Sequence, residues 1–134
     1  MKKFAKVMAV MMVAVIALAL LVSCAPNSDP DKALSALKEN GYTAARDSLI
    51  VPTALTLVGV KGIEVVISGT KVVDGTTEHV TIIYFNNSSS ANDAWDDVKK
   101  YAEDNKDDKD SNWVFAKSGA MIYYGTSAAI KAAK

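Results

Sequence analysis

Cys24 is the only cysteine of the chain, and only Ser23 separates it from residues 7–22, which carry no polar side chain. Before this apolar run, three of the first six residues are lysines. A basic start followed by an apolar run and a small residue is typical of a secretory signal peptide. A helix that crosses a bilayer needs roughly 20 apolar residues, so residues 7–22 are short for a membrane span. The sequence therefore predicts a secretory leader that precedes Cys24.

The four residues Leu21-Val22-Ser23-Cys24 resemble the lipobox of bacterial lipoproteins. The resemblance implies a diacylglyceryl group on Cys24, cleavage between Ser23 and Cys24 and, in many bacteria, acylation of the new amine. Two or more acyl chains anchor a protein more firmly than one. A buried free thiol after an ordinary signal peptide and an uncleaved membrane anchor are the alternatives.

The lipobox divides the chain into three parts. Residues 1–23 are the expected signal peptide, and residues 24–30, a short polar stretch with two prolines, are the expected lipidated tether that lifts the domain off the lipid surface. Residues 31–134 are the expected single domain. We expect the protein to be lipid-anchored at the extracytoplasmic face of the cell membrane.

His79 is the only histidine and lies beside Glu78 in a predicted strand. A single imidazole excludes a two-histidine metal motif, and the sequence contains no Gly-x-Ser-x-Gly nucleophile elbow. The acidic stretch 104–110 does not match the ligand spacing of a calcium loop. We therefore expect no metal, no cofactor and no catalytic residue, with a small envelope hydrolase that uses His79 as the alternative.

The charge balance bears on possible partners. Loss of the leader removes three of the 15 basic residues, so 12 remain against 15 acidic ones, a net charge of −3. A mildly acidic domain has no electrostatic support for binding nucleic acid. The expected partners are the membrane, through the lipid on Cys24, and an envelope protein or peptide.

Three helices are expected from capping and periodicity. The first covers residues 31–40, with Asp29 or Ser28 as the cap and Gly41 as the stop. The second begins at Ser90, which forms a capping box with Asp93, and its apolar stripe includes Trp95 as a core residue. A short last helix is capped by Thr126 or Ser127.

Extended segments are expected at 42–47, 63–73, 78–85, 113–117 and 120–124, whereas residues 48–59, interrupted by Pro52, match no element clearly. Asp74-Gly75 predicts a first hairpin and Ser118-Gly119 a second. The strand at 78–85 is apolar on both faces, so helices are expected to pack on the sheet. The expected fold class is α+β, a small antiparallel sheet of about five strands with helices packed on it, after a cleaved signal helix.

Tyr123 and Tyr124 are adjacent in a predicted strand, so their rings point to opposite faces. One ring is expected to be exposed and to serve a binding surface. The stretches TIIYFNNSSSANDAWDDVKKYA and GAMIYYGTSAAIKAA resemble the carboxyl-terminal half of small lipoproteins of Gram-positive anaerobes, a group without an assigned activity. The expected function is a non-enzymatic binding or accessory module that uses its sheet or its second hairpin.

Overall fold

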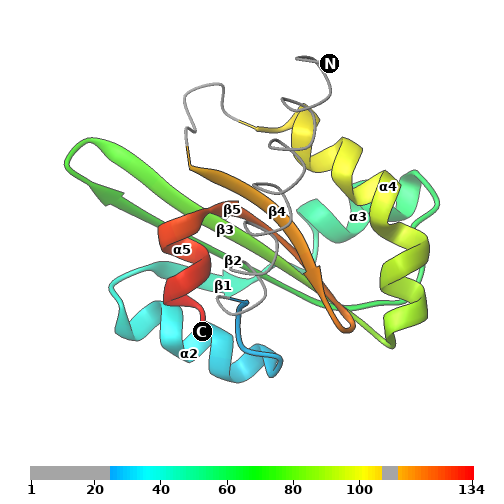
Figure 1. Ribbon diagram of the computed structural model, residues 1–134, viewed down its shortest axis with the longest axis horizontal. Helices are drawn as coiled ribbons and strands as arrows, with labels where there is room; N and C mark the ends of the chain where they lie inside the picture. The colour runs from blue at the N-terminus through cyan, green and yellow to red at the C-terminus, as the bar shows by residue number, and fades with distance from the viewer. Residues whose placement is uncertain (1–24, 107–111) are drawn as a thin grey trace, which may run out of the picture.

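Residues 25–106 and 112–134 are described by a computed structural model, and the predicted signal peptide and Cys24 lie outside these ranges (Figure 1). The helices are α2 (Pro30–Glu39), α3 (Ile50–Leu57), α4 (Ser88–Asp104) and α5 (Ser127–Ala132). The strands are β1 (Thr43–Arg46), β2 (Ile63–Val73), β3 (Thr76–Phe85), β4 (Trp113–Ser118) and β5 (Met121–Thr126). The predicted α+β class is confirmed.

The five strands form one antiparallel sheet in the order β1-β2-β3-β5-β4. Both predicted hairpins are present: β2 and β3 turn at Asp74 and Gly75, which have φ angles of 52° and 79°, and β4 and β5 turn at Gly119. The two hairpins are joined by pairing of β3 with β5, from Tyr84 opposite Met121 to Val80 opposite Gly125. This long-range pairing makes one sheet out of two local units.

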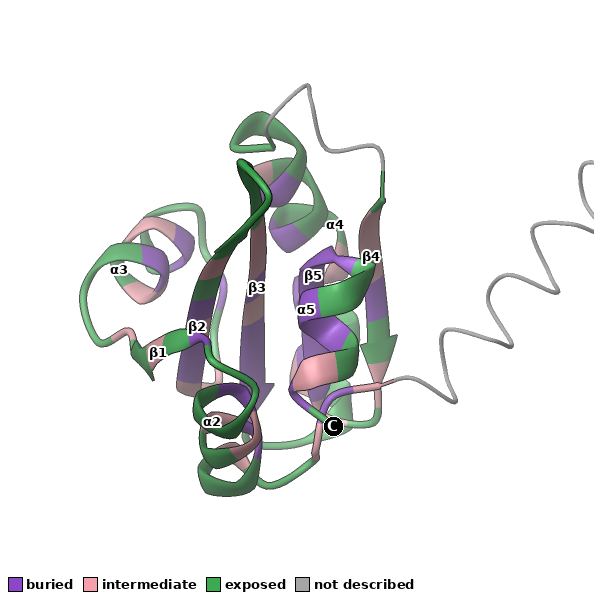
Figure 2. Cartoon of the chain, turned by 90° about the vertical axis from the view of Figure 1, so that its left-hand side faces the viewer, coloured by how far each residue is buried: buried purple, intermediate pink, exposed green. Residues whose placement is uncertain are grey.

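Helices cover both faces of the sheet (Figure 2). The α2 and α5 helices pack on one face with Ile82 and Tyr123, whereas α3 and α4 pack on the other face with Ile83 and Tyr124. Because successive residues of a strand point to opposite faces, a strand with two covered faces has to be apolar throughout. Because both faces of β3 are covered, its sequence does not alternate between apolar and polar residues as that of a strand with one solvent-exposed face would.

Helix α2 begins and ends as the sequence predicts, within one residue. The Asp29 carboxylate accepts the Asp31 N–H at 2.9 Å, Pro30 occupies the first helical position, and Gly41 follows the helix with a φ of 85°. The capping box predicted for α4 is wrong. Asn87 is the cap, and its side-chain oxygen accepts the Ser90 N–H at 2.8 Å, so Ser90 lies inside the first turn.

Helix α3 occupies the segment that matched no element clearly. Asp47 lies before the helix, and its carboxylate accepts the N–H groups of Leu49, Ile50 and Val51 at 3.0, 2.8 and 2.9 Å. Pro52 lies in the first turn, where its missing N–H would have had no helical partner in any case. Burial raises the pKa of Asp47, but the three backbone donors lower it more, so the pKa lies below its ordinary value.

We expect the substitution Asp47→Ala to lower the free energy of unfolding by about 1 kcal/mol, because three first-turn donors lose their acceptor. Urea unfolding of a soluble form that begins at Ala25 measures this. The pKa of Asp47 is lowered in the folded state, so its carboxylate contributes stability above a pH of about 4 and loses that contribution as the pH falls through the folded pKa. A difference from the wild type that persisted unchanged in acid would contradict this role.

Candidate functional site

Residues 25–29, which directly follow Cys24, are part of the folded domain. The Asn27 N–H donates to the Ala133 carbonyl at 2.9 Å, and the Tyr84 hydroxyl donates to the Asn27 carbonyl at 2.7 Å. Pro26 is buried, and Ala25 packs against the core under α2 and α5. Residues 25–30, which were expected to form part of a tether, therefore pack on the domain, chiefly through Pro26 and the backbone of Asn27.

Tyr84 is the main side chain that holds this segment. Burial raises the pKa of its hydroxyl, and the nearby Asp29 carboxylate raises it further. The raised pKa keeps the hydroxyl protonated, and a donor to the Asn27 carbonyl, into more alkaline solution than an ordinary tyrosine. Tyr84 comes from the end of β3, so the central strand of the sheet fixes the start of the described chain.

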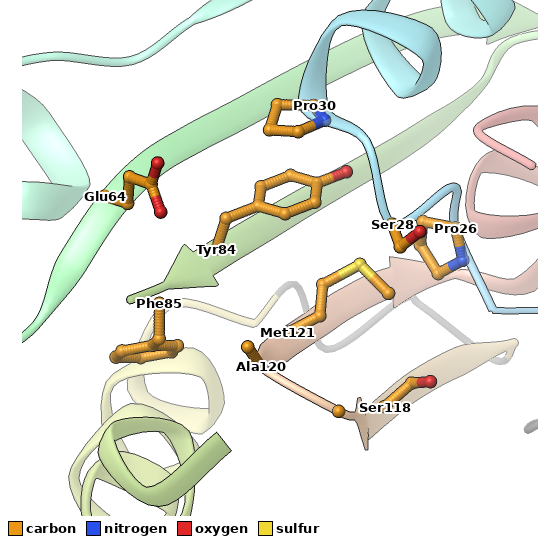
Figure 3. Close-up of a pocket in the computed structure, with 10 residues that line it drawn as sticks. Pro26, Ser28, Pro30, Glu64, Tyr84, Phe85, Ser118, Ala120 and Met121 are labelled. Carbon is orange, nitrogen blue, oxygen red and sulfur yellow. The ribbon is translucent and has the colours of Figure 1, made fainter. Parts of the chain in front are cut away.

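A cavity of about 520 Å³ lies beside the same segment (Figure 3). The Tyr84 and Met121 side chains contribute apolar surface, and Glu64 contributes a carboxylate. Apolar walls with a few polar groups are typical of small-molecule sites. The wall consists of Pro26, Ser28, Pro30, Glu64, Tyr84, Phe85, Ser118, Gly119, Ala120 and Met121.

His79 lies elsewhere, in β3 opposite Thr70 of β2. It is half-buried, and Thr126 engages its main chain: the His79 N–H donates to Thr126 Oγ1 at 3.2 Å, and Oγ1 lies 3.4 Å from the His79 carbonyl. Thr126 has the position of the cap of α5, as predicted, but its side chain makes no capping bond because it bonds to β3 instead. The structure does not bring His79 into the wall of the cavity beside residues 25–29.

Tyr123 and Tyr124 are both buried, with exposed fractions of 0% and 7%. The expectation that one ring is exposed is wrong, because α5 covers one face of β5 while α4 covers the other. Burial raises the pKa of Tyr124, and a hydrogen bond to the Thr81 side chain offsets only part of this rise. Neither ring is accessible as an anchor for a partner.

Aromatic residues gather where α4 meets β4 and β5. The Trp95 and Phe115 rings lie 4.6 Å apart between centroids, and Trp113 and Tyr124 continue the cluster. The expectation that Trp95 is a core residue is only partly right: it packs against the core but is half-buried, and Lys117 Nζ lies 5.5 Å from its ring. The fully buried positions of α4 are taken by small residues that allow close approach to the sheet, namely Ala91, Ala94, Val98 and Ala102.

The largest exposed apolar side chains lie on and around α3. The exposed fractions of Leu49, Ile50, Leu57 and Val58 are 73%, 75%, 82% and 56%. These residues belong to a run without any charged side chain, residues 49–60. We call these four residues the α3 patch. This patch was not predicted, although the sequence carries a signal for it, a charge-free run preceded by the capping residue Asp47.

Within residues 25–106 and 112–134, no three metal-ligating side chains gather into a possible site, and no helix has the length and apolar character needed to cross a membrane. No family model, curated protein or solved structure matches this chain. The resemblance of its carboxyl-terminal half to small lipoproteins stays a prediction.

Proposed function

We propose that this chain is a lipoprotein, anchored by lipid on Cys24 at the extracytoplasmic face of the cell membrane, whose folded part is a non-enzymatic binding or accessory module. The observation that carries the anchorage is the lipobox Leu21-Val22-Ser23-Cys24 after a basic start and an apolar run. The part of the chain that the structure describes begins at Ala25, directly after the proposed lipidation site.

The α3 patch supports the binding role. Leu57 and Ile50 expose four fifths and three quarters of their surface, and large apolar side chains exposed close together in the chain are typical of interaction sites. The partner that we propose is a protein with an apolar surface rather than the bilayer. The reason is that α3 packs on one face of the sheet, whereas Ala25, which leads to Cys24, packs on the opposite face.

The experiment that tests this function introduces a charge into the patch. We expect Leu57→Glu to remove a cross-linked partner band from the lipidated protein in cells and to abolish complementation of a deletion strain, because an apolar interface would have to bury an unpaired carboxylate. Val72→Glu is the matched control, since Val72 is 70% exposed in β2 near the first hairpin turn. It should keep both the band and the complementation.

The possible outcomes separate the proposed functions. Full activity of a folded Leu57→Glu protein would show that the α3 patch binds no required partner. Loss of complementation in a folded His79→Ala protein, with Leu57→Glu active, would favour the hydrolase alternative. Unfolding midpoints of each variant distinguish loss of binding from loss of fold.

A further inference from the structure

We propose that the domain rests directly on the bilayer in one orientation, with the end that holds residues 25–29 against the lipid headgroups and the α3 patch directed away from them. This inference rests on the proposed lipidation of Cys24. The partner that we propose for this end of the domain is a lipid surface. The supporting observation is that residues 25–29, which lead to the proposed anchor at Cys24, pack on the domain.

Contacts on either side of Asn27 and at Asn27 itself hold this segment in place. Asn27 is bonded through its N–H to Ala133 at 2.9 Å and through its carbonyl to Tyr84 at 2.7 Å. Before it, Pro26 is buried, and after it the Asp29 N–H donates to the Asn27 side-chain oxygen at 2.9 Å. The next residue, Pro30, begins α2. The segment therefore has the contacts of a structural element and not those of a free linker.

Covalent geometry limits how far the anchor can lie from this fixed segment. An extended chain advances about 3.6 Å per residue at most, so the Cα atom of Cys24 lies within roughly 7 Å of that of Pro26. A lipid on Cys24 enters the headgroup region from that point. The anchor therefore holds this end of the domain close to the headgroups unless residues 25–29 leave their site.

The neighbours of the segment define the surface that faces the lipid. The Ala133 carbonyl accepts the Asn27 N–H, so the exposed Lys134 follows directly after a residue that is bonded to this segment. The turn residues Gly119 and Ala120 line the same cavity as Pro26 (Figure 3). This surface carries the Lys134 ammonium group together with the carboxylates of Asp29 and Glu64, so the lipid on Cys24, and not net charge, is what brings it to the headgroups. Helix α3 packs on the opposite face of the sheet, so its patch remains open to a protein partner.

The test uses the lipidated protein in vesicles of phosphatidylglycerol and phosphatidylcholine that contain a lipid with a headgroup quencher. Because Cys24 is the only native cysteine and its thiol is consumed by the lipid, Lys134→Cys or Leu57→Cys supplies a single free thiol for a fluorophore. We expect quenching at position 134 to be several-fold stronger than at position 57. Insertion of a long Gly/Ser linker between Cys24 and Ala25 is the matched control and should remove this difference.

Fatty-acid labelling of the same samples separates the two proposals. Labelled protein with equal quenching at positions 134 and 57, or a difference that the linker leaves unchanged, would overturn the fixed orientation and leave the lipid anchor intact. Absence of label would overturn the anchor and the orientation together.

Discussion

The substitution Gly125→Ala is expected to have the largest effect on stability, a loss of about 4 kcal/mol in the free energy of unfolding. Gly125 has a φ of 143°, and a Cβ atom there would lie 2.1 Å from the His79 carbonyl oxygen and 2.8 Å from the Val80 Cα atom. Both neighbours are backbone atoms of β3, so they cannot rotate away as a side chain would. Relief requires β5 to separate from β3 at the pairing that joins the two hairpins.

Gly119→Ala is the matched control for this substitution. Gly119 also has a positive φ, 58°, but a Cβ atom added there would have no neighbouring atom within 4 Å. It should cost only about 1–2 kcal/mol, the backbone penalty alone. Urea unfolding of a soluble form that begins at Ala25 compares the two, and equal midpoints would show that the β3–β5 contact at Gly125 is not tight.

The substitution Cys24→Ala is expected to have the largest effect on location. Alanine has no thiol to receive a diacylglyceryl group, so incorporation of a clickable fatty acid should fall to background and the precursor should retain residues 1–23. Ser23→Ala is the control, because alanine keeps a small side chain at the position before the cysteine. Equal labelling of wild type and Cys24→Ala would show that the lipid is attached elsewhere or not at all.

Local signals in the sequence predicted most of the elements. Asp74-Gly75 needs two positive φ angles, which Gly and Asp tolerate, and the structure has the hairpin turn there. Pro30 and Gly41 bound α2 as expected because each has a backbone preference that is independent of the rest of the fold. Likewise, the apolar residues on both faces of the predicted strand at 78–85 led to the correct expectation that helices pack on the sheet.

Tertiary contacts decided the rest. Helix α3 was missed because its apolar run has no helical stripe, since one side of the helix packs on the sheet and the other remains exposed as the α3 patch. Strands β3 and β5 are separated in the sequence by the whole of α4, so no local sequence pattern indicates that they pair. Trp95 lies on the predicted stripe, yet the small residues of α4 approach the sheet more closely and leave the indole at the margin.

The candidate site was only partly predictable for the same reason. The lipobox is a contiguous motif and could be recognised from four residues. The contacts of Asn27 depend on Tyr84 and Ala133, which lie 57 and 106 residues further along the chain. A polar stretch with two prolines has the composition of a linker, and only these distant partners make it part of the domain.

The most direct test of the lipoprotein proposal is the mass of the native protein isolated from its membrane, with peptide sequencing of its first residues. We predict a chain that begins at Cys24 and carries a diacylglyceryl group on that sulfur, with or without a further acyl group on the amine. A chain with an unmodified Cys24 thiol, or one that begins at any other residue, would contradict the proposal.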